Sequence, residues 1–127
     1  MRILVVAFAI ALLCGAGLGQ RKPPEVQVVE TRASREEGKI LIDGVVRCSA
    51  AKPLRGLIVY FDLLNAENGV VATENAVLEE DVIEPQQERS YHSATSDHAR
   101  AVRFRVRASD KDVRELRVAN GGPFPIE

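Results

Sequence analysis

Apolar and polar residues alternate with a period of two along most of the chain after residue 25, a pattern that predicts half-buried antiparallel strands rather than helices. In residues 39–49, every second position from Ile40 to Cys48 is apolar or glycine, while Asp43 and Arg47 mark the opposite face. Turn residues separate such segments at regular intervals. We predict seven strands, at residues 25–33, 39–49, 55–64, 69–78, 88–95, 99–109 and 113–118.

Short strands at this spacing predict an all-β fold, an immunoglobulin-like or fibronectin-III-like antiparallel β-sandwich of about seven strands. The first strand breaks its alternation at Val28 and Val29, so we expect a β-bulge there. The strand at 55–64 is apolar on both faces except at Asp62, which is typical of a central strand. If this placement is right, Asp62 either reaches the rim of the sheet or pairs with an arginine.

Two further side chains have predicted places in the core. Cys48 lies on an apolar strand face, where a free thiol behaves as a small hydrophobic group. An intermolecular disulfide is the less favoured alternative. We expect Tyr91 to be buried, with its hydroxyl bonded to a backbone acceptor as in the tyrosine corners of Greek-key sandwiches.

The first 19 residues have the features of a secretory signal peptide. Arg2 provides a positive start, residues 3–14 are an unbroken apolar run, and small residues follow. Cleavage is expected after Gly19, with Gly17 as the alternative. The mature chain then has 16 basic and 18 acidic side chains, because Arg2 is lost from the total of 17 basic residues. A net charge near −2 argues against general nucleic-acid binding.

Two other interpretations of the N-terminal segment have less support. A transmembrane helix needs roughly 20 consecutive apolar residues, and this run is shorter and ends in glycines. A lipidated Cys14 would normally follow a small residue, and Leu13 precedes it. We therefore predict an exported protein, periplasmic or extracellular, without stable membrane insertion after cleavage.

The remaining residues divide into three parts. Residues 20–24 are polar and proline-rich and are predicted to be a disordered leader. The sandwich domain is expected at 25–119, a length sufficient to bury a core without a metal or a disulfide. Residues 120–127 contain two prolines, which favours an edge covering or an extended tail over another strand.

The segment from Phe61 to Asn65, with Gly69 and the Val70-Val71 pair after it, resembles the motif that names the FxLYD domain family. Leu64 and Asn65 stand where the family has Tyr and Asp. Further similarity lies in Ile42–Val46, in the 49–55 link and in Ile83-Glu84-Pro85, after which Gln86 replaces an expected glycine. The resemblance implies an immunoglobulin-like sandwich in bacterial exported proteins, and it carries no catalytic residues across.

A row of arginines is the most specific surface feature of the sequence. Arg103, Arg105 and Arg107 share one face of a predicted strand, and Arg117 would join them if the following strand returns in the right register. One hypothesis is a binding site for an anionic partner. The favoured alternative is a solvent-facing sheet whose arginines pair across strands, for example with Glu115.

Residue types with metal or catalytic chemistry are present, but in patterns without diagnostic spacing. His92, His98 and Asp97 fall short of the four ligands usual in a structural metal site. The acidic run 79–81 lacks the spacing of a calcium loop and is favoured as a solvated loop. The adjacent Ser96-Asp97-His98 cannot act as a hydrolase triad, whose members come from separate segments.

These observations predict a non-catalytic, exported β-sandwich module for protein interaction or scaffolding in the cell envelope, with no metal and no cofactor. The expected partner is another envelope protein, bound through a sheet face or an edge strand. The alternative is a module that binds an anionic or carbohydrate ligand through the arginine-rich sheet face.

Overall fold

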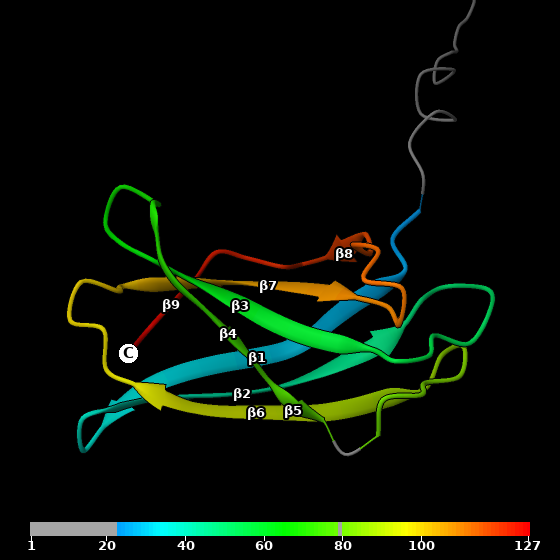
Figure 1. Ribbon diagram of the computed structural model, residues 1–127, viewed down its shortest axis with the longest axis horizontal. Helices are drawn as coiled ribbons and strands as arrows, with labels where there is room; N and C mark the ends of the chain where they lie inside the picture. The colour runs from blue at the N-terminus through cyan, green and yellow to red at the C-terminus, as the bar shows by residue number, and fades with distance from the viewer. Residues whose placement is uncertain (1–22, 79) are drawn as a thin grey trace, which may run out of the picture.

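The alternating segments form two sheets, antiparallel except for the pair of β1 with β8, that pack face to face in the computed structural model, which describes residues 23–78 and 80–127 (Figure 1). One sheet contains β1 (Val26–Glu36), β2 (Lys39–Cys48), β5 (Val77–Leu78), β6 (Glu88–Ser96) and β8 (Val118–Ala119). The other contains β3 (Ile58–Leu64), β4 (Val70–Asn75), β7 (Arg103–Ser109) and β9 (Phe124–Pro125). Their orders are β5-β6-β2-β1-β8 and β4-β3-β7-β9. This order matches the two sheets of the immunoglobulin fold, so the predicted fold class is confirmed.

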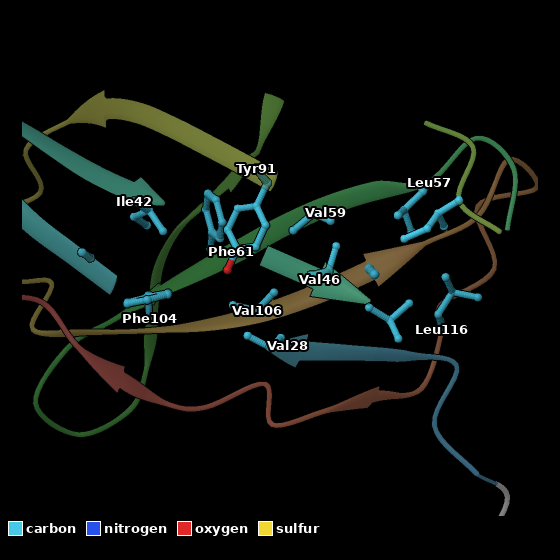
Figure 2. Packing of buried hydrophobic residues seen from close by; sticks show 14 of the residues in the cluster. Val28, Ile42, Val46, Leu57, Val59, Phe61, Tyr91, Phe104, Val106 and Leu116 are labelled. Carbon is cyan, nitrogen blue, oxygen red and sulfur yellow. The ribbon is translucent and has the colours of Figure 1, made fainter. Parts of the chain in front are cut away.

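The core lies between the sheets and is centred on β3 (Figure 2). Phe61 is fully buried, with its ring centroid 5.9 Å from that of Tyr91 and 6.3 Å from that of Phe104. These three rings come from both sheets, since Tyr91 belongs to β6 and the phenylalanines to β3 and β7. Cys48 is buried as predicted and has a free thiol.

The pairing of β1 with β2 shifts its register between Val28 and Glu30, which confirms the predicted bulge. Tyr91 is buried as expected, but its hydroxyl does not bond to the backbone. It donates instead to Thr31 Oγ1 at 2.6 Å, and Thr31 Oγ1 donates to the Asp43 carbonyl at 3.1 Å. The phenol therefore reaches the backbone through one threonine, because the tyrosine ring crosses the space that Gly44 leaves empty opposite it.

The prediction of one strand at 69–78 is wrong. The chain leaves the second sheet after the Ala76 N–H donates to the Val59 carbonyl at 2.8 Å, and Val77 and Leu78 then pair with β6 in the first sheet. β4 and β5 are therefore two strands in different sheets. Alternation alone does not reveal this crossing, because Ala76 is partly buried and packs against the core like a strand residue.

The predicted return strand at 113–118 is also wrong. Only an isolated bridge joins Glu115 to Ser109, and the chain then turns away, so that Val118 and Ala119 pair in parallel with β1 of the other sheet. The physical reason is the loop after β7. The Asp110 carboxylate accepts the N–H groups of Asp112 and Arg114 at 2.9 and 3.0 Å and closes a tight turn, and the pairing with β7 ends where the Leu116 N–H donates to the Ala108 carbonyl at 2.9 Å.

Residues 120–127 cover one side of the sandwich. Phe124 and Pro125 pair with β7, while the Glu127 N–H donates to the Ala33 carbonyl of β1 at 3.0 Å. The tail thus joins the edges of both sheets on that side. On the opposite side, β4 is the outermost strand of its sheet.

The predicted signal peptide, Cys14 and residues 20–22 of the leader lie outside the described residues. Across residues 23–78 and 80–127, no helix is long and apolar enough to cross a membrane.

Candidate functional site

The outer face of the second sheet is organised around Asp62, whose exposed fraction is only 2%. Arg105 donates to Asp62 Oδ2 from Nη2 at 2.6 Å and from Nε at 3.1 Å. Arg107 donates to Oδ1 from Nη2 at 3.2 Å, and the hydroxyl of Thr73 donates to the same oxygen at 2.9 Å. The guanidinium carbon of Arg107 also lies 4.4 Å from the ring centroid of Tyr60. Of the two alternatives expected for Asp62, pairing with arginine is the one that the structure shows.

The charge balance at this carboxylate favours its ionised form. Burial raises the pKa of Asp62, but the hydrogen bonds from Arg105 and Thr73 and the charge of Arg107 outweigh burial and leave the pKa below its usual value. Asp62 therefore pairs with two neighbouring arginines of the predicted row. Arg105 and Arg107 thus already have an ion-pair partner within the protein.

The outer arginine of the row is also held. Arg103 donates to Asn68 Oδ1 at 3.0 Å and to the Ala66 carbonyl at 2.8 Å, both in the loop between β3 and β4. Arg107 makes a further, longer contact of 3.4 Å with Glu115, the partner expected from the sequence. These contacts leave less of the guanidinium donor capacity for an outside anion.

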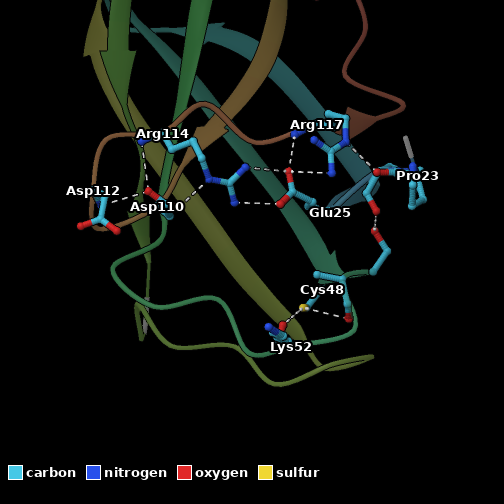
Figure 3. A network of polar contacts seen from close by, with 11 residues as sticks. Pro23, Glu25, Cys48, Lys52, Asp110, Asp112, Arg114 and Arg117 are labelled. Carbon is cyan, nitrogen blue, oxygen red and sulfur yellow. Dashed lines mark hydrogen bonds and ion pairs between the residues drawn. The ribbon is translucent and has the colours of Figure 1, made fainter. Parts of the chain in front are cut away.

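Arg117 does not join the row, because the residues after it pair with β1 in the other sheet. Its Nε donates to the Pro23 carbonyl at 2.8 Å, and its backbone N–H donates to Glu25 Oε1 at 3.1 Å. Arg114 donates to Glu25 Oε2 at 2.9 Å, so one carboxylate gathers two arginines (Figure 3). The hydrogen bonds of Arg114 are the main reason why the pKa of Glu25 lies below its usual value.

This ion-pair network borders a groove of about 550 Å³ at one end of the sandwich. The groove lies between the 49–57 loop, which follows β2, and the 110–117 loop, which follows β7. Figure 1 shows both loops at the end of the molecule where the described chain begins. Prolines and alanines provide much of the lining, and charged side chains surround it.

Sequence reasoning missed this network and the groove beside it. Glu25 and Arg114 are 89 positions apart, so no local spacing connects them. The one local signal is Asp110, which is four residues before Arg114 and bonds to its side chain at 3.2 Å. Such a spacing predicts a contact but not a groove.

The residues considered for metal or triad chemistry do not converge. Asp97 accepts a hydrogen bond from Arg35 Nε at 2.9 Å, and His98 Nε2 lies 3.8 Å from Glu74 Oε2. His92 is on β6, with Asp43 as its cross-strand neighbour, and lines a separate hollow of about 590 Å³. Among the described residues, no group of three or more potential ligands is arranged to hold a metal ion. Glu79 of the acidic run lies outside that set.

The free edge of β4 is a second candidate surface. Alternate residues of an antiparallel strand bond to the same neighbour. Because Ala76 bonds to β3, Glu74 does so as well, and the N–H and C=O groups of Thr73 and Asn75 point away from β3. β4 has no lysine or proline to block a further strand, and its first residue, Val70, is 53% exposed.

No protein-family model matches the chain, and no curated protein matches its sequence. Among solved structures, the chain is similar to part of the alkylpurine DNA glycosylase AlkC of Pseudomonas fluorescens, bound to DNA containing an abasic site analogue. The identity is 16%, the TM-score is 0.42, and the similarity covers 82% of this chain and 31% of that one. The chain therefore spans about a third of the length of that protein, and a similarity of this size has no bearing on function.

Proposed function

We propose that the protein is a non-catalytic, exported β-sandwich module that binds another protein by strand addition at β4. The observation that carries this proposal is that the backbone groups of Thr73 and Asn75, on a six-residue edge strand, have no partner among residues 23–78 and 80–127. An extended partner segment would satisfy these groups and continue the sheet. Export is supported by the signal-like N-terminal sequence, and the resemblance to FxLYD domains agrees with it.

The geometry favours this edge because the opposite side of the sandwich is already covered. There, β9 and the residues after it bond to β7 and β1. Proteins usually cover or interrupt the edges that must not pair. On the uncovered side, β4 is the longer edge strand, because β5 at the edge of the other sheet has only two residues.

Anion binding by the arginine row has less support. Two of the three arginines are paired with Asp62, and the third donates to the loop between β3 and β4. An anion would have to compete with a buried carboxylate that already makes charge-assisted hydrogen bonds. We therefore assign the row a structural role.

The experiment compares two proline variants in a pull-down with extract and culture medium of the source organism. Asn75→Pro removes an N–H that points to the free edge, so we expect it to abolish partner binding while the fold persists. Ala99→Pro is the matched control. It places proline at the second position of the turn closed by the Ala101 N–H and the His98 carbonyl at 2.8 Å, where proline is favoured.

Both variants should keep the thermal midpoint of the wild type within a few degrees, about the effect of a surface substitution. The proposal requires that the wild type and Ala99→Pro recover the same protein and that Asn75→Pro does not. Recovery of that protein by all three would exclude strand addition at β4.

A further inference from the structure

The groove between the 49–57 and 110–117 loops is built before any ligand arrives. Ser49 Oγ donates to the Pro24 carbonyl at 3.0 Å, and the Lys111 N–H donates to the Arg55 carbonyl at 3.0 Å. Lys111 also packs directly on Gly56, where an added Cβ would lie 2.5 Å from its own Cβ. Both loops are thus fixed to the body of the protein, and little conformational entropy would be lost on binding.

The N-terminal segment of the described chain forms a third side of this groove. Glu25 holds Arg114 and Arg117, and Arg117 holds the Pro23 carbonyl (Figure 3). The two arginines nearest this segment therefore have a carboxylate partner within the protein. They therefore stabilise the shape of the groove and are not counted as its unpaired charges.

Three other cations around the groove have no such partner. Lys52, Arg55 and Lys111 are exposed, and none forms an ion pair with the described residues. Asp112, a carboxylate in the groove lining, is also exposed and forms no ion pair with the described residues. Three unpaired positive charges against one negative charge leave the groove positive, although the whole chain has a formal net charge of −1.

The lining between these charges is apolar and small. Pro24, Ala51 and Pro53 are exposed to the groove, and no aromatic side chain lines it. A sugar ligand would lack the aromatic surface on which sugar rings stack. An extended peptide with alternating acidic and apolar residues would match both the charge and the lining. The leader of this chain does not, since Arg21 and Lys22 have the same sign as the groove.

We propose that this groove binds an extended acidic segment of a partner protein, whose carboxylates contact Lys52, Arg55 and Lys111. The proposal rests on the interaction role proposed above but uses a surface that does not include β4. It therefore assigns the module a second contact with a partner, at the end of the sandwich.

The test uses a fluorescein-labelled ten-residue peptide of alternating glutamate and proline, which is extended and does not aggregate into strands. Binding to the full mature chain is measured by fluorescence anisotropy. We expect saturable binding that weakens as salt rises from about 20 mM to about 300 mM, because exposed charges are screened. The same peptide with glutamine in place of glutamate should not bind.

Charge variants locate the site. Replacing Lys52, Arg55 and Lys111 by serine should weaken binding at least about fivefold, the effect of losing a few exposed ion pairs. The control replaces Arg32, Lys39 and Arg100 by serine. It changes the net charge equally at exposed positions that do not line the groove, and it should stay within about twofold of the wild type.

Three results would overturn the proposal. The first is no binding of the peptide up to about 1 mM. The second is an equal loss of peptide binding in the groove variant and its control. The third is binding of an acidic oligogalacturonate that is tighter than that of the peptide and depends in the same way on the groove lysines. The Asn75→Pro variant separates the two proposals. It should bind the peptide like the wild type, whereas the groove variant should keep the interaction that depends on β4.

Discussion

Asp62 is the one charged residue buried among the described residues, and its two arginines are only partly exposed. Removing the charge leaves Arg105 and Arg107 facing a neutral amide at a buried position. We predict that Asp62→Asn lowers the free energy of unfolding by about 2 kcal/mol, less than for a fully buried pair because water reaches both arginines. Urea denaturation at neutral pH measures the change. Asp43→Asn, at an exposed carboxylate, should change it by less than about 0.5 kcal/mol.

The difference in the free energy of unfolding between the wild type and Asp62→Asn should become smaller as the pH falls. An aspartate in the unfolded chain titrates near a pKa of about 3.9, and in the folded protein the pKa of Asp62 is lower, since its arginine and threonine bonds outweigh burial. The unfolded state thus takes up a proton at higher pH than the folded state. The stabilisation is complete above about pH 5 and is lost as the pH falls through the folded pKa. A difference in the free energy of unfolding between wild type and Asp62→Asn that stays constant down to about pH 2 would contradict this.

Gly44 is needed for the position of Tyr91. A Cβ at residue 44 would overlap the Cζ and hydroxyl of Tyr91 and lie 2.6 Å from the backbone oxygen of Glu30. We predict that Gly44→Ala lowers the free energy of unfolding by about 2 kcal/mol, typical of overpacking, and disturbs the near-ultraviolet signal of tyrosine. At Gly69, an added Cβ meets only the side chain of Asn65, at 3.2 Å, so Gly69→Ala should be much milder.

Tyr91 also shows why a residue can be placed in the core from sequence while its partner cannot. Burial raises the pKa of the Tyr91 hydroxyl to about 12, and the hydroxyl donates to Thr31, 60 positions away. Period-two alternation identifies the buried face of β6. The alternation does not show which strand lies opposite or in which register. That register decides which group accepts the hydrogen bond of the Tyr91 hydroxyl.

At the scale of the strand, the one-sided pairing of β4 with β3 predicts a pattern of amide hydrogen exchange. The amides of Thr73 and Asn75 have no partner strand in the described part of the chain, whereas those of Glu74 and Ala76 bond to β3. We predict that Glu74 and Ala76 exchange at least about tenfold more slowly than Thr73 and Asn75 in the unbound protein. Equal protection of both pairs would mean that this edge is already paired in solution.

Strand ends and crossings were the least predictable elements. Residues 69–78 look like one alternating strand, yet β4 and β5 lie in different sheets, because the chain crosses between them at Ala76. Residues 113–118 alternate as well, but Asp110 closes a turn and sends Val118 to β1. In both cases a local contact redirects the backbone without altering the alternation of apolar residues.

At the scale of the whole molecule, the C-terminal segment ties the two sheets together. Phe124 pairs with Phe104 at a ring distance of 5.4 Å, and the residues that follow bond to β1. We predict that Phe124→Ala lowers the free energy of unfolding by about 2 kcal/mol and that both sheets still unfold in one transition. Val77→Ala, at a side chain that is 58% exposed, should change it by about 0.5 kcal/mol or less. Separate transitions for the two sheets would contradict the prediction.

The sequence by itself determined the fold class, most strands, the bulge after Val28 and the burial of Cys48, and it limited Asp62 to two alternatives, the rim of the sheet or an arginine partner. These follow from periodicity and from the free energy of burying apolar groups and charges, which depend on each residue and its near neighbours. Only the tertiary structure decided that Arg117 leaves the arginine row, that Glu25 joins Arg114, and that a positive groove opens beside them. Such features depend on contacts between residues nearly the whole domain apart, and no local pattern specifies those contacts.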